Sequence, residues 1–548
     1  MPRSFRTSLL SLAGIVVLGS CHPPAPPGPP PAPARADSAV VEEGARAIPP
    51  APVVPAAAPP PVAREFRGAW VTPLSGGHLP DWPSRPGLPA AAQQAELREL
   101  LDAARDIGLN AVILHVRTAG DAMYPSPYAP WSAFLSGRSG EAPTPGYDPL
   151  AFAIAEAHAR GLQLHAWFNP FRALLPNIAN GRAAATHVTR THPEWIRTYG
   201  TQTWIDPGDP NAREFVVASI ADVVRRYDVD GIHIDDYFYP YREQERVRVG
   251  TGRRRRTVTR DIDFPDDRTW ERFGRLRGFG SRADWRRANV DAFVERMYET
   301  VKAEKPWVLV GISPFGIWRS GHPAGVTGLD AYAEIYADSR KWLQRGWVDY
   351  LVPQLYWELD GAQRRFTRLY AWWMQQDTLG RHIWPGVHTD REVIRSGQWG
   401  PRAVEDEVTW LRSRVDADGS TGHVHFTLGA LRPGTRDVGA GMRERVYDTP
   451  ALVPPSPWLG ARGPLAAPAV HWRADTLVAT PATAYPLAWW LVQRRVAGGA
   501  WDSRLIRAGE GALVLRPHEL RGASAVAVTA VARDMVASAA TSVNVNGH

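Results

Sequence analysis

The stretch "NAREFVVASIADVVRRYDVDGIHIDDYFYP", residues 211–240, holds one complete helix-then-strand unit. Its first half places apolar residues every three or four positions, a spacing typical of an amphipathic helix. Its second half contains a short apolar run, residues 230–235, which is typical of a buried strand and ends at two adjacent aspartates. The unit therefore raises two questions: how often it recurs, and what the paired carboxylates do.

The same alternation recurs along residues 64–455, and several of the helical segments end in Gly, as helix C-termini do. This pattern predicts a (β/α)8 barrel with long loop insertions. An open doubly wound sheet is the alternative, but no Gly-rich phosphate loop follows the first strand. The eight expected strands are residues 65–71, 110–117, 162–168, 230–235, 307–313, 349–355, 382–387 and 423–428.

Residues 1–20 have the basic start and short apolar run of a signal peptide. The run ends in "LGSC", and Cys21 is the only cysteine among 548 residues. This ending resembles a bacterial lipobox and predicts lipidation at Cys21, with an ordinary signal peptide as the alternative. Because His22 follows Cys21 instead of an acidic residue, the expected location is the periplasmic face of the outer membrane, held by the lipid anchor.

Two further regions flank the predicted barrel. Residues 21–63 are rich in Pro and Ala, a composition that cannot bury a core and predicts a disordered tether. Residues 456–548 contain short alternating strands with turn residues between them, which predicts a small β-sandwich similar to a fibronectin type III module. Another β topology is the alternative. Because a barrel closes its own core, we expect residues 64–455 to fold and act without this C-terminal region.

Polar side chains gather where the expected strands end. Residues two apart on a strand share a face, and a barrel carries its active site at the carboxyl ends of its strands. The mouth is therefore expected to hold Arg117, Trp167 with Asn169, and Asp235 with Asp236. Sugars offer hydroxyls to such polar groups and C–H faces to aromatic rings. Two close carboxylates also drive their pKa values apart, as glycoside hydrolysis requires.

Further polar and aromatic residues follow other strands, and their recurrence favours a cleft for a polymer. Glu358 is a candidate second catalytic carboxylate, and a solvated loop position is its alternative. The expected substrate-binding residues, beyond those already at the mouth, are Asp121, Tyr237, Tyr239, Trp318, Gln354, Tyr356 and Trp357.

A metal centre is a competing interpretation of the same strands. His115, His165 and His233 share a face with Asp235, and His with carboxylate is a zinc combination. These three histidines lie two residues deeper than the mouth, where core histidines are commoner than metal ligands. We therefore predict neither a metal nor another cofactor, with a metal-dependent amidase or deacetylase as an alternative function.

Long blocks of the chain resemble the bacterial glycosyl hydrolase-like 10 family. They include "LHVRTAGDAMYPSPYAPWS", "GLQLHAWFNPFR", "VDGIHIDDYFYP", "VGISPFGIWR" and "VDYLVPQLYW". The resemblance implies a (β/α)8 glycosidase, often a lipoprotein with a fibronectin-like C-terminal domain, that cleaves peptidoglycan glycan strands. A non-catalytic wall-binding lipoprotein is an alternative. The resemblance implies that the following residues are site positions of the family: Arg117, Asp121, Asn169, Asp235, Asp236, Gln354 and Tyr356.

One segment fits the resemblance less well in length and charge. It carries eight Arg residues between positions 242 and 260. It is either a solvated insertion or a region that attracts an anionic cell-wall polymer. Nucleic acid is not an expected partner for a chain that is exported and tethered to a membrane.

Overall fold

The computed structural model describes residues 58–74, 80–175, 182–251, 255–359, 361–390, 402–419, 421–434, 438–460, 464–482 and 485–545. The predicted signal peptide, Cys21 and most of the Pro/Ala-rich segment lie outside these residues. Among the helices of the described residues, none combines the length and apolar content needed to cross a bilayer.

All eight expected strands form, and they join in one parallel sheet. The seventh is interrupted at residues 384–385, so it counts as two short strands that pair with neighbours on opposite sides. The last strand pairs with the first, which returns the sheet to its start and confirms the predicted α/β barrel. In barrel order the strands are β2 (Phe66–Val71), β3 (Ala111–Arg117), β4 (Gln163–Phe168), β8 (Gly231–Ile234), β11 (Leu309–Ile312), β12 (Tyr350–Leu351), β13 (His382–Ile383), β14 (Gly386–Val387) and β15 (Gly422–His425).

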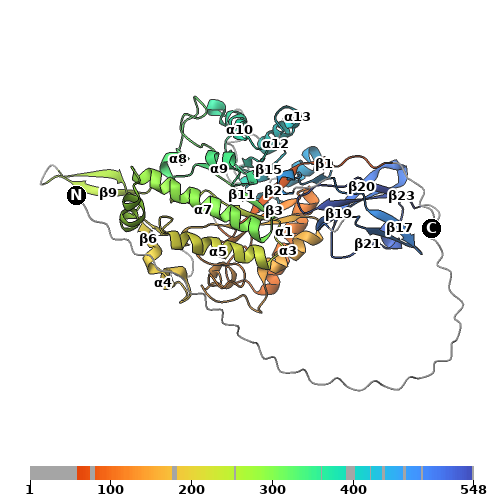
Figure 1. Cartoon of the computed structure of the whole chain (residues 1–548), viewed down its shortest axis with the longest axis horizontal. Coiled ribbons are helices and arrows are strands. Elements are labelled where there is room, and N and C mark those ends of the chain that lie inside the picture. The colour runs from red at the N-terminus through yellow and green to blue at the C-terminus, as the bar shows by residue number, and fades with distance from the viewer. Residues whose placement is uncertain are drawn as a thin grey trace, which may run out of the picture. The chain divides into compact units, whose positions relative to one another are not determined.

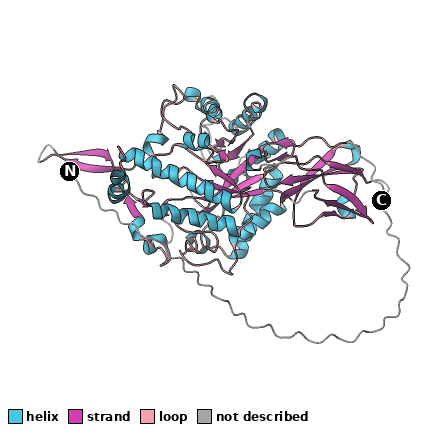
Figure 2. Ribbon diagram, in the orientation of Figure 1, coloured by secondary structure: helices cyan, strands magenta, loops and turns pink. Residues whose placement is uncertain are grey.

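A helix follows each of the first seven barrel strands, and these helices cover the outside of the sheet (Figures 1 and 2). The helix before the fourth barrel strand, α5, shows why these helices form. Asp209 caps it by accepting a hydrogen bond from the backbone N–H of Asn211, and Pro210 occupies its first turn. The seven helices are α1 (Ala90–Ile107), α3 (Pro149–Ala159), α5 (Pro210–Arg226), α7 (Arg282–Glu304), α9 (Ser339–Arg345), α10 (Arg365–Gln376) and α12 (Ala403–Arg412).

Large rings fill the inside of the barrel, and strand glycines make room for them. A Cβ atom at Gly311 would lie 1.9 Å from the ring of Tyr350, and one at Gly231 would lie 2.5 Å from the ring of His165. The interior is thus packed with aromatic and imidazole rings beneath the mouth. Its fully or almost fully buried aromatic residues include Phe66, Trp70, Tyr350 and Trp384.

Two excursions leave the barrel at the carboxyl ends of its strands. After the third strand, β5 (Arg172–Leu174), β6 (Ile196–Tyr199) and β7 (Gln202–Ile205) form a small antiparallel sheet. After the fourth, β9 (Gln244–Val249) and β10 (Arg256–Asp261) form an antiparallel hairpin. Short helices complete the connections: α2 (Ala133–Ser136), α4 (Val188–Thr191), α6 (Asp267–Thr269), α8 (Ala331–Glu334), α13 (Val415–Asp418) and α14 (Val438–Gly441).

The C-terminal region consists of two antiparallel sheets that share a hydrophobic cluster. The first, in spatial order, contains β17 (Ala469–Arg473), β18 (Thr476–Thr480) and β21 (Leu513–Leu515). The second contains β20 (Trp501–Arg507), β19 (Leu487–Arg495), β22 (Ala525–Ala532) and β23 (Thr541–Asn544), and α15 (Pro517–Leu520) links β21 to β22.

The C-terminal region also completes the base of the barrel. Trp489, Val531 and Met535 belong to the same buried cluster as the rings inside the barrel. Arg507 and Arg533 form ion pairs with Asp228, at 2.7 and 2.6 Å, just before β8. The strands β1 (Ala63–Arg64) and β16 (Ala451–Leu452) pair in parallel, and Arg64 donates to the carbonyl of Met535 at 3.0 Å. The sequence had led us to expect a barrel that closes its own core. Residues of the C-terminal region instead complete that core.

Candidate active site

Asp235 and Asp236 are the first two residues beyond β8, which is held between β4 and β11. The backbone N–H of Ser313 donates to the carbonyl of Ile234 at 2.8 Å and fixes the end of the strand. Both aspartates are buried, with 5% and 3% of their surface exposed. Two carboxyl groups are thus withdrawn from water at the mouth of the barrel.

The carboxyl group of Asp235 meets an amide with a fixed orientation. Asn169 Oδ1 accepts the backbone N–H of Arg172 at 3.0 Å, so its Nδ2 is directed to Asp235 Oδ2, also at 3.0 Å. Burial raises the pKa of Asp235 to about 7; the charge of Asp236 also raises it, whereas the charge of Arg172 and the bond from Asn169 lower it. At neutral pH a large fraction of Asp235 therefore carries a proton.

Asp236 has a different set of partners. Tyr241 donates its hydroxyl to Asp236 Oδ2, and Gln354 contributes a side-chain hydrogen bond. Gln354 Nε2 is also within 3.3 Å of Ser313 Oγ, which ties the amide to the neighbouring strand end. Burial raises the pKa of Asp236, and these hydrogen bonds oppose the rise. The two carboxyl groups are therefore chemically distinct despite being adjacent.

Tyr237 and its neighbours form an aromatic wall beside the carboxyl groups. The guanidinium of Arg172 lies over the ring of Tyr237, 4.4 Å from its centroid. Tyr241 meets the same ring edge-on, with 5.4 Å between centroids. Because Tyr237 keeps part of its surface exposed, it can offer a face to a ligand.

The structure brings Asn169, Asp235, Asp236, Tyr237 and Gln354 together as the sequence predicted. It adds Arg172 and Tyr241, which sequence reasoning missed. Both lie beyond the barrel strands and follow a proline, at positions 170 and 240, so strand alternation gives no direction for their side chains. Their presence in "NPFR" and "DDYFYPYR", next to recognised site residues, was the available signal.

Three predicted aromatic residues lie near the mouth or just below it. Trp167 is buried in the barrel and stacks on His115 at 3.8 Å between ring centroids. Tyr356 is half-buried and meets His388 edge-on at 4.7 Å. Trp357 is half-buried and lies edge-on to Phe315 at 6.2 Å. Trp167 therefore supports the site from below, while the other two belong to the loop after β12.

Glu358 follows these residues on the same loop and is half-buried. Within the described ranges, its carboxylate has no hydrogen bond or ion pair. Its environment therefore differs from that of the two buried aspartates.

Two predicted polar residues have other surroundings. The pairing of β3 with β4 shifts register between His115 and Arg117, so the two-residue alternation does not extend to Arg117. Arg117 is buried, its charge interacts with Tyr124 and Asp121, and burial lowers its pKa. The Asp121 carboxylate accepts the backbone N–H groups of Thr118 and Ala119, at 3.0 and 2.8 Å, and so shapes its own turn.

Two predicted aromatic residues lie in packed regions. Trp318 is buried and donates its indole N–H to Asp338 at 2.9 Å. Tyr239 is buried against Phe264 and Tyr336, with ring centroids 5.3 and 5.1 Å away. Both positions favour a structural role over contact with a ligand.

Two of the three barrel histidines have both ring nitrogens engaged by protein groups. The third, His115, contacts Thr72 through Nδ1 at 3.1 Å, and its buried Nε2 has no hydrogen-bond partner among the described residues. His165 contacts the Tyr350 hydroxyl at 2.7 Å and Gln163 at 3.2 Å, and His233 contacts Tyr350 and Trp70, both at 3.1 Å. Burial lowers the pKa of both rings, to about 4 for His165. Both ring nitrogens of each are therefore occupied. Among the described residues, no three His, Cys, Asp or Glu side chains are grouped to hold a metal ion.

A cavity of about 820 Å³ lies at the other end of the barrel. Its lining includes Asn110 and Gly161, which precede β3 and β4, and Leu505 of the C-terminal region. In this fold, residues at the amino ends of the strands contribute to stability and those at the carboxyl ends to chemistry. The candidate site therefore remains at the buried carboxyl pair.

The sequence profile of the glycosyl hydrolase-like 10 family matches residues 65–391, more than half of the chain and all of the candidate site. The chain belongs to the glycosyl hydrolase-like 10 family. This confirms the resemblance seen in the sequence blocks and makes the protein glycosidase-like.

Curated relatives agree with the membership in the glycosyl hydrolase-like 10 family. The chain is 36% identical over 409 residues to glycosyl hydrolase YngK of Bacillus subtilis (strain 168), covering 73% of this chain and 75% of the relative. It is 36% identical over 346 residues to glycosyl hydrolase DigH of Escherichia coli (strain K12), covering 59% and 73%. Among solved structures, the PgaB (BpsB) glycoside hydrolase domain from Bordetella bronchiseptica is 14% identical with a TM-score of 0.42, covering 69% of this chain and 99% of that chain.

Proposed function

We propose that the protein is an endo-acting glycoside hydrolase that cleaves the β-linked amino-sugar strands of peptidoglycan. The observation that carries the proposal is the buried pair Asp235 and Asp236, of which Asp235 has a pKa raised to about 7. A protonated carboxyl group beside one held by hydrogen bonds is the combination that glycosidic cleavage needs. The membership in a glycosidase-like family supports it.

The adjacency of the two aspartates suggests how they divide the work. Neighbours on one strand end cannot flank a glycosidic bond from opposite sides, as a simple pair of catalytic carboxylates does. A 2-acetamido sugar can supply its own nucleophile. Asp236, held by Tyr241 and Gln354, orients the acetamide so that its carbonyl oxygen attacks C1.

Asp235 then acts on the leaving group. It gives its proton to the glycosidic oxygen as the bond from C1 to that oxygen breaks. Water next attacks C1 of the resulting oxazolinium, and the Asp235 carboxylate takes the proton from the water, which restores both groups. Asn169 and Arg172 keep Asp235 from becoming too weak an acid, because both favour its ionised form.

Digestion of purified glycan strands, followed by mass analysis of the new ends, tests the proposal. We expect internal cleavage with one water added per cut, and Asp235→Asn to produce these ends about 10²–10⁴-fold more slowly at the same enzyme concentration. Binding of the strands without cleavage by the wild-type protein would support a non-catalytic wall-binding lipoprotein instead. Inhibition of strand processing by a chelator would support a metal-dependent amidase or deacetylase.

We also propose that Cys21 is lipidated and holds the protein at the periplasmic face of the outer membrane. The "LGSC" ending of the signal segment and the following His22 support this location. Fractionation of cells that express Cys21→Ala tests it. The variant should leave the membrane fraction with its soluble activity intact, and continued membrane association would contradict the anchor.

The C-terminal sheets support a proposal about that region. We infer a fibronectin type III-like module from the seven strands among its described residues, which divide into sheets of three and four around a shared cluster. Its attachment to the barrel base, through Arg507 and Arg533, suggests that it stabilises the enzyme.

A further inference from the structure

The hairpin formed by β9 and β10 is a separate two-stranded sheet that inserts into the loop after the catalytic aspartates. Figure 1 shows it extending away from the helices beyond one end of α7. Its residues from Gln244 to Val249 and from Arg256 to Asp261 are all exposed or half-buried. A two-stranded hairpin is at best marginally stable by itself, so something else must hold it.

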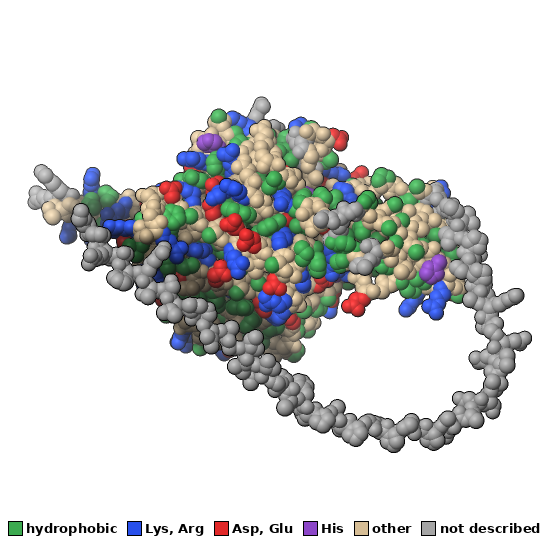
Figure 3. All heavy atoms as spheres, viewed as in Figure 1, with side chains coloured by type: hydrophobic (Ala, Val, Ile, Leu, Met, Phe, Trp, Pro, Cys, Tyr) green, Lys and Arg blue, Asp and Glu red, His purple; other side chains and the backbone are tan. Residues whose placement is uncertain are grey.

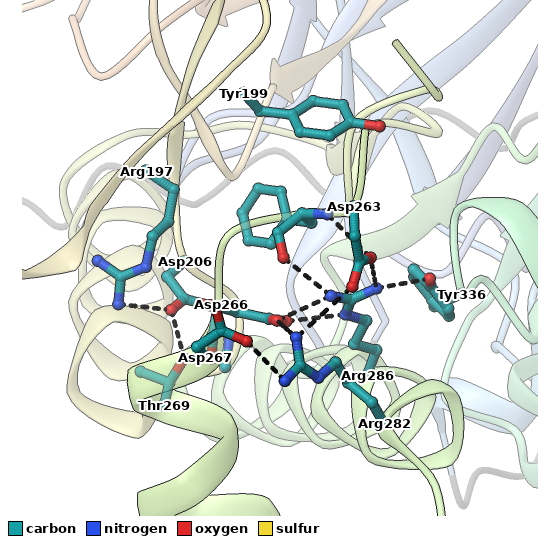
Figure 4. Close-up of polar contacts among 12 residues, drawn as sticks. Arg197, Tyr199, Asp206, Asp263, Asp266, Asp267, Thr269, Arg282, Arg286 and Tyr336 are labelled. Carbon is teal, nitrogen blue, oxygen red and sulfur yellow. Dashed lines mark hydrogen bonds and ion pairs between the residues drawn. The ribbon is translucent and has the colours of Figure 1, made fainter. Parts of the chain in front are cut away.

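A network of ion pairs and hydrogen bonds holds the base of the hairpin (Figure 4). Arg286 of α7 pairs with Asp266 at 2.7 Å and with Asp263 at 2.8 Å, just after β10. The Tyr199 hydroxyl donates to the carbonyl of Ile262 and accepts the backbone N–H of Glu243, both at 3.0 Å. The hairpin is therefore held on both sides of its base by α7 and the small sheet.

Uncompensated positive charge lies farther out on the hairpin. Near the base, Arg260 pairs with Glu245 at 3.2 Å, and Arg242 contacts Asp261 at 3.3 Å. Arg246, Arg248, Arg255 and Arg256 are exposed, and within the described ranges none of them has an ion pair. We call these four residues the arginine cluster. Figure 3 shows Lys and Arg side chains gathered over this part of the molecule.

The strand register arranges part of the cluster. Arg246 lies opposite Thr259, and Arg248 lies opposite Thr257. These two arginines and two threonines therefore share one face of the hairpin. Arg246 and Arg248 are two residues apart and present a row of donors, with hydroxyls across from them. The acidic residue on this face, Asp261, lies at the base end of the row, where Arg242 and Gln244 engage it at 3.3 and 2.9 Å. Guanidinium groups bind carboxylates and phosphates in bidentate geometry.

The hairpin is also linked directly to the carboxyl pair. Tyr241, which donates to Asp236, is followed at once by Arg242 at the base of the hairpin. The root of the hairpin therefore adjoins the carboxyl pair, where a polymer bound across Asp235 and Asp236 can reach it.

We propose that the arginine cluster binds anionic groups on the glycan outside the linkage that is cleaved, so the substrate class is a polyanionic glycan. This inference rests on the proposed function. The cluster raises the local concentration of the strand and guides it toward the mouth, an effect that weakens as salt screens the charges.

The test compares two full-length variants with equal charge changes. One carries R246Q, R248Q, R255Q and R256Q. The control carries R473Q, R495Q, R516Q and R521Q, four exposed positions of the C-terminal region. Each is assayed for kcat/KM and for co-sedimentation at low and high salt. The probes are glycan strands with free carboxylates, the same strands with amidated carboxylates, a polysaccharide with phosphodiester groups, and vesicles containing anionic lipid.

We expect the hairpin variant to lose about tenfold or more in kcat/KM and in binding on carboxylate strands at low salt. The activity of the hairpin variant on amidated strands should stay unchanged. The control variant should keep wild-type activity and binding with every probe. The phosphodiester arm shows whether phosphate serves as well as carboxylate. Equal kcat/KM and binding of the two variants on carboxylate strands would overturn the inference. So would a loss by the hairpin variant on amidated strands as large as its loss on carboxylate strands. Binding that depends on the hairpin only when the probe is a vesicle would also overturn it.

Co-sedimentation separates this inference from the proposed function. If the wild-type protein cleaves none of the strands but its binding still depends on the arginine cluster, the hydrolase proposal fails and the inference stands. If it cleaves carboxylate strands and the hairpin variant does so equally well at low salt, the inference fails and the hydrolase proposal stands.

Discussion

At the scale of single residues, the decisive property is the protonation of Asp235. Its pKa rises to about 7 because the carboxyl group is buried and Asp236 lies beside it. Adjacency is visible in the sequence, but burial and the opposing charge of Arg172 are not. The sequence therefore predicts which residues meet at the mouth better than it predicts their charge states.

The raised pKa of Asp235 has a consequence for stability. A carboxyl group whose folded pKa lies above its ordinary value holds its proton more tightly when folded, so stability falls as pH rises from about 4 to about 7. Each pKa unit corresponds to about 1.4 kcal/mol. Asp235→Asn removes this penalty. The free energy of unfolding of the variant minus that of the wild type should therefore be larger at pH 8 than at pH 5. Chemical unfolding at both pH values measures this, and an unchanged difference would contradict the raised pKa.

Arg172 should set the pH dependence of the reaction. Its charge lowers the pKa of Asp235, so Arg172→Gln should raise that pKa and move the alkaline limb of kcat/KM to higher pH. Arg190→Gln, an exposed change between the third and fourth barrel strands, is the control. A profile that falls at the same pH as the wild type would show that Arg172 does not act on the general acid.

At the scale of elements, apolar runs and turn residues were enough to predict all eight barrel strands. The site residues that followed strand alternation, Asn169 and Asp235, were placed correctly beside each other. Arg117 did not follow it, because the register shift in β3 changes the direction of its side chain. Local irregularities of this kind depend on pairing between strands and leave no pattern in the sequence.

The glycine of β11 is a testable part of this architecture. Gly311→Ala would place a Cβ atom 1.9 Å from the ring of Tyr350, whose hydroxyl contacts His165 and His233. Overpacking of this kind costs about 1–3 kcal/mol, so thermal unfolding should occur at a lower temperature. Gly146→Ala, at a position with open space, should leave that temperature unchanged. Equal melting of the two variants would contradict the packing.

At the scale of the whole molecule, the barrel and the C-terminal sheets share a core. The sequence suggested a barrel that closes itself, because a contact between segments this distant cannot be read from local periodicity. Trp489 and Met535 instead pack into the cluster inside the barrel, and Arg507 pairs with Asp228 ahead of the strand that carries the buried carboxyl pair.

Removal of the C-terminal region should therefore destabilise the protein. A chain that ends at residue 455 should be poorly soluble or melt at a lower temperature than the full chain, because its apolar base is exposed to water. The full chain with Arg507→Gln and Arg533→Gln loses only the ion pairs and should be affected less. A truncated chain with the melting temperature and turnover of the full protein would restore the view of an independent barrel.

The most direct test of the account is the turnover of purified glycan strands by three conservative variants. General acid catalysis contributes about 10²–10⁴-fold, so Asp235→Asn and Asp236→Asn should each lower kcat by roughly that factor while strand binding is retained. Glu358→Gln should have little effect. Loss of activity in the Glu358 variant, together with near wild-type turnover by either aspartate variant, would contradict catalysis by the adjacent pair.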